Sequence, residues 1–199
     1  MEEKIVYFEK PGPVNTEETL RLVIERAKAR GITKIVLAST RGDTAKLAAE
    51  RLTGTGITMV VVPHQYGFGP GQRFPAELVK DLAKKGHIVH FSTNLFHTEE
   101  LYGSPAPRVM ALLLRTFSQG MKVCFEIVMM AVDGGCVPAG ENVIVVAGTG
   151  AGADTAVVVQ AACSRRLPDL HVMEIICKPL LNRQRVPNFL PEEGPYPPS

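Results

Sequence analysis

The sequence contains no tryptophan, and aromatic residues make up only 6% of its 199 residues. Proteins that hold single-stranded nucleic acid stack its bases on aromatic side chains, so this scarcity argues against that class. Basic and acidic residues nearly balance, at 22 and 20, and Lys and Arg never occur in runs longer than two. Because nucleic-acid-binding proteins usually carry a basic stripe, we expect no nucleic acid partner.

Cysteine pairs at metal-ligand spacing are also absent. The sequence has four cysteines, at Cys124, Cys136, Cys163 and Cys177, and no C-x-x-C motif. We expect reduced, mostly buried thiols and no metal site, with a zinc site or a disulfide framework as the alternative.

Long apolar runs are missing as well. The longest, residues 127–132, is far too short to cross a bilayer, and the first residues form no apolar signal core. We therefore expect a cytoplasmic protein with no membrane partner. The sequence leaves the oligomeric state open, with a homo-oligomer as one option.

What the sequence does contain is the composition of a globular domain, 45% hydrophobic and 21% charged. Strand-like apolar runs alternate with segments of helical periodicity, which predicts a three-layer α/β/α sandwich with a mostly parallel sheet. The expected strands are residues 4–8, 32–38, 57–62, 87–92, 142–147 and 171–177. The expected helices are residues 16–30, 44–52, 75–85, 105–117, 121–132 and 155–163. We assign residues 1–186 to one domain and residues 187–199 to a Pro-rich tail.

Ligands of such folds bind beyond the carboxyl ends of the strands, so the loops there carry the candidate site. The first of these loops is Ser39-Thr40-Arg41-Gly42-Asp43-Thr44. It combines hydroxyl groups, a guanidinium and a glycine at the start of a helix, which suits a phosphate. The alternative is an ordinary capped helix with Arg41 in solvent.

A second candidate loop is rich in glycine. Gly148, Thr149 and Gly150 begin a segment that matches the loose dinucleotide fingerprint G-x-G-x-x-G/A, between an expected strand and an expected helix. An anion cradle is one interpretation, and a tight strand-to-helix turn is the other. The fingerprint also needs an acidic residue at the end of the next strand. Glu174 is near that distance but falls within the strand, so a ribose contact is not expected.

Two further loops supply aromatic and polar side chains. Residues 63–74 include Gly67, Phe68 and Gly69, and could cover a flat ligand or form a mobile surface loop. Residues 93–97 include Asn94, a candidate for polar contacts with the ligand.

Three titratable residues are candidates for catalysis. His64 and His97 lie in these loops and titrate near neutral pH, although a loop histidine is more often part of the polar surface. Glu126 interrupts an apolar helical segment, so it either faces solvent or a pocket, or forms a buried ion pair. Neither a Walker motif nor a G-x-S-x-G elbow occurs, so no nucleophile is identified.

Parts of the sequence resemble the C-terminal domain of pyruvate kinase. The resemblance covers most of residues 15–180 in layout. Its specific motifs are Ile-Val-Leu-Ala-Ser-Thr-Arg-Gly-Asp-Thr-Ala at residues 35–45 and Val-Ile-Val-Val-Ala-Gly-Thr-Gly at residues 143–150. Residues 171–179 are similar to its final strand. The catalytic barrel has no counterpart here, so we expect no pyruvate kinase activity.

The chain looks like the stand-alone archaeal proteins of pyruvate kinase C-terminal-domain type. That resemblance implies a sheet of order 3-2-1-4-5 with the last strand antiparallel, here with an extra N-terminal strand. It also implies that the Ser39–Thr44 and Gly148–Asp154 loops flank one crevice, the first of them holding a phosphate. Flavin mononucleotide is a ligand associated with the group. The long loop at residues 63–74 departs from the kinase domain and leaves room for a flat ligand.

We therefore expect a protein that binds a phosphorylated small molecule, with flavin mononucleotide as the first choice. The alternatives are a regulatory domain that binds a sugar phosphate, and a small lyase or isomerase that uses His64 or His97. The sequence leaves open whether the protein catalyses a reaction.

Overall fold

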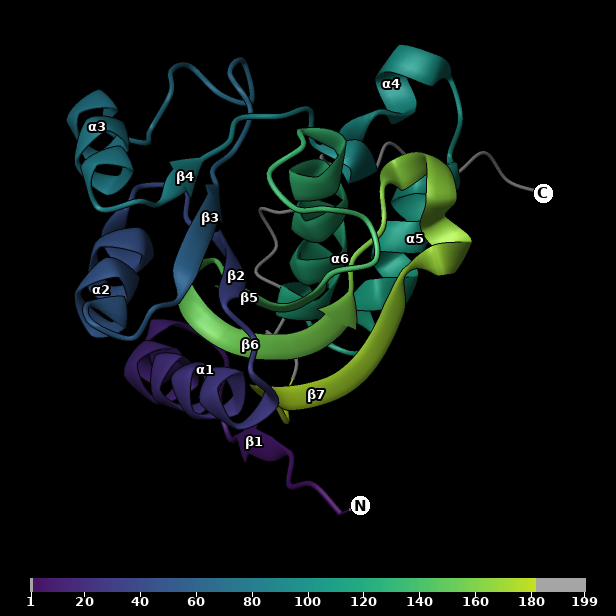
Figure 1. Cartoon of the computed structure of the whole chain (residues 1–199). Helices are drawn as coiled ribbons and strands as arrows, with labels where there is room; N and C mark the ends of the chain where they lie inside the picture. The colour runs from purple at the N-terminus through teal and green to yellow at the C-terminus, as the bar shows by residue number, and fades with distance from the viewer. Residues whose placement is uncertain (1, 182–199) are drawn as a thin grey trace.

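The computed structural model describes residues 2–181, which fold into a seven-stranded sheet with helices packed on it (Figure 1). The proposed tail at residues 187–199, and the last residues assigned to the domain, lie outside the described residues. Within residues 2–181 a single sheet has the strand order β1-β7-β6-β5-β2-β3-β4. Its strands are β1 (Val6–Phe8), β2 (Lys34–Ala38), β3 (Thr58–Val62), β4 (Ile88–Val89), β5 (Asn142–Thr149), β6 (Ala151–Gln160) and β7 (His171–Pro179).

The strand order confirms the expected fold class. Strand β2 lies between β3 and β5 and is parallel to both, with Leu37 opposite Val146. Counted from β2, the order is 3-2-1-4-5, and the fifth strand, β6, is antiparallel to β5. The extra N-terminal strand is present as β1, which pairs with β7 in parallel. Residues 171–177 are thus a sixth strand of this series rather than the fifth.

The predicted helix at residues 155–163 is wrong, because most of this segment belongs to strand β6. The run Val157-Val158-Val159 is β-branched and favours a strand, and every residue from Ala153 to Val159 is buried. Strands β5 and β6 form an antiparallel hairpin in which Val146 lies opposite Ala156. Gly150 occupies the tight turn with a φ of +79°, a conformation that glycine adopts without steric cost.

Helices cover both faces of the sheet and make the three layers (Figure 1). One face carries α1 (Thr16–Arg30), α2 (Asp43–Leu52) and α3 (Ala76–Lys84), while α6 (Gln119–Asp133) covers the other. Helix α5 (Ala106–Arg115) packs on α6, and the short helix α4 (Glu99–Tyr102) precedes it. The described part of the chain also contains three 3-10 helices, η1 (Pro13–Asn15), η2 (Leu95–His97) and η3 (Ser164–Asp169).

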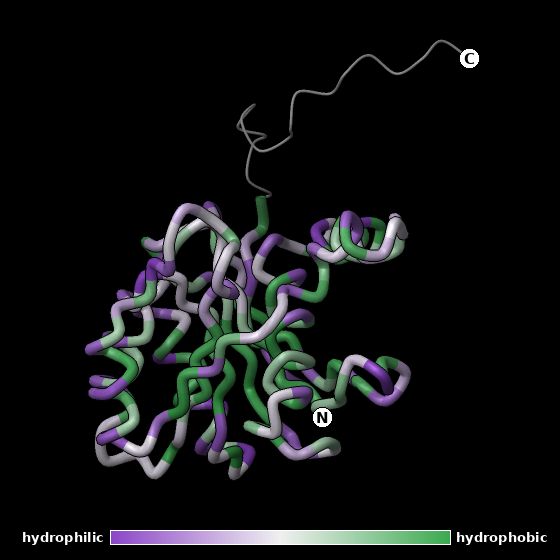
Figure 2. Tube along the Cα trace, turned by 90° about the horizontal axis from the view of Figure 1, so that it is seen from above, coloured by the Kyte–Doolittle hydropathy of each residue, from purple (hydrophilic) through white to green (hydrophobic). Residues whose placement is uncertain are grey.

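Alternate residues of the central strands point into two hydrophobic cores. Leu37 of β2 faces the core under α1, α2 and α3, whereas Val36 faces the core under α6. Figure 2 shows the hydrophobic segments gathered at the centre of the molecule and the hydrophilic ones toward its edge. Both faces of the sheet are therefore buried, as in other parallel sheets. No helix within residues 2–181 is both long and apolar enough to cross a membrane.

Candidate functional site

The N-terminus of α2 lies at the carboxyl end of β2, and Gly42 is its N-cap residue. Gly42 has a φ of +91° and no side chain with which to cap the helix. The amide of Ala45, in the first turn, donates to Ser39 Oγ at 3.3 Å. The preceding amides of Asp43 and Thr44 point out of the helix without an intrahelical acceptor, as at any helix start. Together with the positive end of the helix dipole, they form a place for an anion.

Glycine is favoured at position 42, because other residues rarely adopt its positive φ and their Cβ atom would displace the Leu78 side chain. A Cβ atom there would lie 2.4 Å from Leu78 Cδ2 and 3.4 Å from Pro75 Cδ. The start of α2 therefore packs directly against the start of α3. This close approach fixes the position of the loop between β2 and α2.

The side chains of this loop have different exposures. Ser39 and Thr44 are buried, Thr40 is half-buried, and Arg41 and Asp43 are exposed. Ser39 is already used inside the protein through its hydrogen bond to Ala45, so its hydroxyl has less freedom to bind a ligand than the sequence suggested. Thr40 and Arg41 remain the side chains best placed for a phosphate.

A small pocket joins this loop to the loop that follows β3. It is lined by Thr40, His64, Gln65, Phe68, Gly69, Gly71, Gln72 and Arg73. The structure thus brings together four of the residues singled out from the sequence: Thr40, His64, Phe68 and Gly69. It adds a second guanidinium, Arg73, which the sequence analysis did not assign to the site. Gly67 is exposed beside Phe68.

The loop at residues 63–74 is held in place by side-chain hydrogen bonds. Gln72 Nε2 donates to the carbonyl of His64 at 2.9 Å. Gln65 Oε1 accepts from the amide of Asn94 at 2.7 Å, and Asn94 Oδ1 accepts from the amide of Gln65 at 3.4 Å. Asn94 is buried and ties two loops together. Its contact with a ligand stays a prediction, because its side-chain oxygen is already in use.

A buried charged pair lies beneath the loop that follows β4. Lys122 and Glu126, one turn apart on α6, form an ion pair with 2% and 4% of their surfaces exposed. Glu126 Oε1 also accepts from the amide of Phe96 at 2.8 Å, and Lys122 Nζ lies 3.2 Å from His97 Nε2. Of the alternatives for Glu126, the structure shows the buried ion pair.

These contacts change the ionisation of the basic groups around them. Burial lowers the pKa of Lys122, and the neighbouring Glu126 carboxylate opposes that change. Burial, followed by the charge of Lys122, lowers the pKa of His97, and burial lowers that of His64. Both histidines are therefore neutral at pH 7. With Lys122 donating to Nε2 of His97, the remaining proton of the imidazole is assigned to Nδ1.

Phe68 lies between the two histidines. Its ring centroid is 4.3 Å from that of His64 and 5.2 Å from that of His97, and 42% of its surface is exposed. The loop at residues 63–74 therefore brings His64 and Phe68 close to the cluster of His97, Lys122 and Glu126. This arrangement offers a partly exposed aromatic ring beside neutral imidazoles.

The glycine-rich segment has a different setting from the one expected. Gly148, Thr149 and Gly150 form the end of β5 and the turn of the β5–β6 hairpin, which is not followed by a helix. Thr16 Oγ1 accepts from the amide of Ala153 at 3.0 Å, so the hairpin packs against the start of α1. The segment lies at the carboxyl edge beside β2 but offers no helix dipole. Its contact with a phosphate stays a prediction with less support.

Lys122 was not among the residues predicted from the sequence. A signal for it was present, because Lys122 and Glu126 are four residues apart in an otherwise apolar helical segment. Two polar residues on the same side of such a helix indicate that they meet each other or a common partner.

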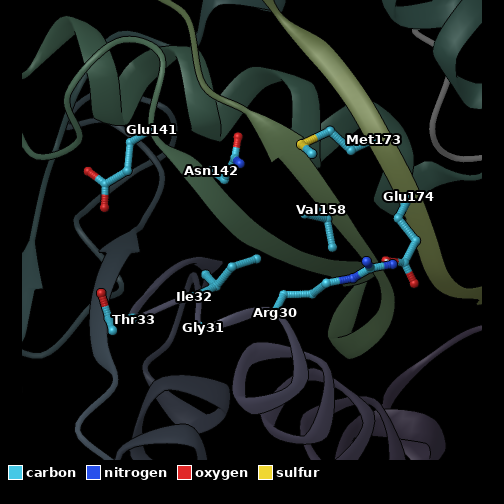
Figure 3. A pocket seen from close by; sticks show the side chains of 9 residues that line it. All are labelled: Arg30, Gly31, Ile32, Thr33, Glu141, Asn142, Val158, Met173 and Glu174. Atoms are coloured by element: carbon cyan, nitrogen blue, oxygen red, sulfur yellow. The ribbon is translucent and has the colours of Figure 1, made fainter.

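A larger cavity lies at the opposite edge of the sheet (Figure 3). Its volume is about 460 Å³, and its walls include Arg30, Glu141 and Glu174. Figure 3 shows the Arg30 and Glu174 side chains meeting on one wall, 3.2 Å apart, with Glu141 on the other. Glu141 pairs with Lys34 at 3.0 Å. Because these carboxylates are neutralised within the chain and the loops lie elsewhere, we place the candidate site at the carboxyl edge.

Comparison with known proteins adds a family to these observations. Residues 17–159 match the family described as "Pyruvate kinase, alpha/beta domain". Among solved structures, Cryptosporidium parvum pyruvate kinase in complex with ADP is similar, with 16% identity and a TM-score of 0.42, over 77% of this chain and 25% of that chain. A second pyruvate kinase structure from the same organism gives 16% identity and a TM-score of 0.42, over 76% and 24%. The chain spans about a quarter of the length of these kinases.

Proposed function

Since this chain belongs to the pyruvate kinase alpha/beta domain family, we propose that it binds a phosphorylated small molecule at the carboxyl edge of its sheet. The phosphate lies at the N-terminus of α2, where Thr40, Arg41 and Thr44 surround the first amides. The remainder of the ligand contacts the loop at residues 63–74, whose pocket has a volume of about 10 Å³ and has to open to admit it. Flavin mononucleotide is the ligand that we put first, and a cytoplasmic location goes with this proposal.

One observation carries the proposal: α2 starts at a glycine N-cap, Gly42, next to a pocket that reaches Arg73. Helix N-termini attract anions through free amides and the helix dipole, and a guanidinium adds paired, charge-assisted hydrogen bonds. Two guanidinium groups are available here, one from each loop. Arg41 directly precedes Gly42 in the sequence, and Arg73 lines the pocket. A doubly charged phosphate suits such a site better than a neutral ligand.

The aromatic side chains support a flat group attached to the phosphate. Phe68 lines the pocket with Thr40, and nearly half of its surface is exposed between His64 and His97. An exposed ring in this position can stack on a planar ligand. A flavin ring fits this description, whereas a sugar phosphate does not need the aromatic surface.

A second candidate function, a lyase or isomerase, is favoured by the state of His97. Its lowered pKa and its contact with Lys122 keep a neutral imidazole with a defined tautomer, as a proton-transferring group requires. Such an enzyme would lose turnover on His97→Ala or His64→Ala while it still bound the phosphorylated ligand. A sugar-phosphate regulatory domain shares the phosphate site and would be unaffected by these changes.

The experiment that tests the proposal is a visible absorption spectrum of the purified protein, followed by thermal unfolding with added compounds. Flavin mononucleotide, a sugar bisphosphate and inorganic phosphate are tested separately. A ligand that binds only the folded state stabilises it by ~2.7 kcal/mol at a hundred times its dissociation constant. A flavin spectrum or a rise in Tm with flavin mononucleotide supports the flavin. A rise with the sugar bisphosphate alone favours the regulatory function, and no rise with any compound overturns the proposal.

A further inference from the structure

Helices α4 and α5 expose an unusually apolar surface. Six large side chains contribute to what we call the α4–α5 face: Leu101, Tyr102, Val109, Leu112, Leu113 and Phe117. Each exposes between 52% and 73% of its surface. Most exposed hydrophobic residues in proteins are scattered, but these six lie on two consecutive helices and the residues that adjoin them.

The apolar residues of α5 lie on both sides of the helix. Met110, Ala111 and Leu114 pack inward against α6 and form a small core with Met129. Val109, Leu112 and Leu113, spaced three and four residues apart, point away from that core and are exposed. A helix with one buried side normally carries polar residues on the other. Figure 1 shows α5 on the outer side of α6, away from the sheet.

The size of the α4–α5 face exceeds what a monomer usually exposes. Exposed aromatic side chains present ~150–250 Å² each, and aliphatic ones somewhat less, so the exposed fractions amount to about 600–800 Å². The largest apolar patch of a typical monomer is ~300–600 Å². A standard stable interface buries ~800 Å² on each partner. The face therefore has the area of one side of a protein–protein interface.

We propose that the α4–α5 face binds a second copy of this chain, with α5 packed against α5 of the other copy about a two-fold axis. In such an interface the same patch serves both subunits, so an apolar surface meets an apolar surface of equal size. The three exposed apolar residues of α5 would form its centre, and Arg108, which is exposed on the same helix, would lie at its rim.

The charges next to the face fit an antiparallel pairing. Glu100 is exposed on α4, before the start of α5, whereas the half-buried Arg115 ends α5 and also donates to Gln119 Oε1. No acidic residue occurs between Glu100 and Glu126. An antiparallel arrangement places α4 of one copy near the last turn of α5 of the other copy. The acidic α4 of each copy then lies near the basic end of α5 of the other copy, and the two-fold axis repeats this contact. Such opposite charges favour the antiparallel orientation over a parallel one.

The test is the mass of the full chain in solution, measured by light scattering after size-exclusion chromatography and by sedimentation over a range of concentrations. The wild-type chain is expected at twice its monomer mass. Leu113→Glu places two carboxylates at the centre of the interface and is expected to give a monomer. Val14→Glu is the matched control, because Val14 is 81% exposed on η1 and lies outside the face. That variant is expected to stay dimeric.

A second variant keeps the test decisive if Leu113→Glu does not fold, as judged by circular dichroism. Leu101→Lys changes the α4 part of the face and is also expected to shift the mass toward the monomer. A wild-type chain that stays monomeric at every concentration overturns the proposal, as does a dimer that both variants retain. Association that appears only after truncation behind Leu181 would show that the end of this chain covers the face, and also overturns it.

Discussion

Lys122 Nζ on α6 lies 3.2 Å from His97 Nε2 in the loop that follows β4. The same ammonium pairs with Glu126 and lies 5.4 Å from the centroid of the Phe96 ring. Its charge is thus surrounded by a carboxylate, an imidazole and an aromatic face. This cluster joins the layer of α6 to the loops of the candidate site.

Lys122→Met is expected to destabilise the protein strongly. It leaves the Glu126 carboxylate buried without its cation, and breaking a buried pair in this way typically costs ~3–5 kcal/mol. The free energy of unfolding from urea denaturation measures the loss. The double variant Lys122→Met/Glu126→Leu removes both charges and should lose much less. Equal losses in the single and double variants would contradict the view that the unpaired carboxylate is the cause.

His87 is expected to make stability depend on pH. His87 Nδ1 accepts a hydrogen bond from the amide of Met59 at 3.3 Å, and burial lowers the pKa of this buried imidazole. Below ~6.5 the unfolded chain takes up a proton that the folded chain does not. The free energy of unfolding should therefore be constant above that pH and fall as the pH drops toward the folded pKa.

The contribution of His87 is isolated by substitution. His64 and His97 have lowered pKa values as well, so part of the pH dependence remains without His87. His87→Asn should give a shallower fall in the free energy of unfolding between pH 6.5 and 5, a window set by the reference pKa of about 6.5. The control is His171→Asn, at an exposed position. An unchanged slope in His87→Asn would show that its protonation is not linked to folding.

Gly42→Ala is expected to cost more stability than Gly54→Ala. Both glycines have positive φ values, +91° and +74°, so alanine at either position costs roughly 1 kcal/mol in backbone strain. A Cβ at Gly54 meets nothing within 4 Å, whereas at Gly42 it lies 2.4 Å from Leu78 Cδ2. That contact adds about 1–3 kcal/mol of overpacking. Thermal or urea unfolding measures the loss of stability in each variant. Equal losses would mean that the Leu78 side chain moves aside without cost, and would contradict tight packing between α2 and α3.

Two of the four cysteine thiols should react much faster than the other two. Cys124 and Cys177 are buried, and burial raises their pKa values, that of Cys177 to about 12. Cys136 and Cys163 are partly exposed. Because the thiolate is the reactive form, a disulfide reagent at pH 8 should modify two thiols in the folded protein and four after denaturation. Rapid modification of all four in the native state would contradict the packing around Cys124 and Cys177.

The mostly parallel sheet and the position of the loops could be predicted from local patterns, whereas the strand order was implied by the resemblance to the pyruvate kinase domain. The apolar runs of β2 and β3 identify buried parallel strands, and the carboxyl ends of parallel strands share one edge. Strand β6 could not be read in the same way. Its first residues follow a glycine-rich segment that also suits a helix start. The β-branched run at residues 157–159 favours a strand, and pairing with β5 and β7 decides between the two. Secondary structure here depends on contacts between distant segments.

The sequence indicates which residues could belong to the candidate site, but it does not show which hydrogen bonds their side chains form. Ser39 and Asn94 were expected to face a ligand, but each forms a hydrogen bond inside the protein. Such bonds depend on which neighbours the fold supplies. The role of Glu126 was left open for the same reason, since its partners, Lys122 and the amide of Phe96, come together only through the packing of α6 on the loops.

The most direct test of the proposed phosphate site compares flavin mononucleotide with riboflavin, which lacks the phosphate, on two arginine variants. Arg41 precedes the N-terminus of α2, and Arg51 lies in its last turn. Isothermal titration should show that the wild-type chain prefers the phosphorylated flavin. Arg41→Gln should lower the ratio of the two affinities by about 10–100-fold, as expected for the loss of a charged hydrogen bond of ~1.5–3 kcal/mol. Arg51→Gln should leave this ratio unchanged. Equal affinity of the wild-type chain for the two flavins, or an unchanged preference in Arg41→Gln, would contradict a phosphate bound at the start of α2.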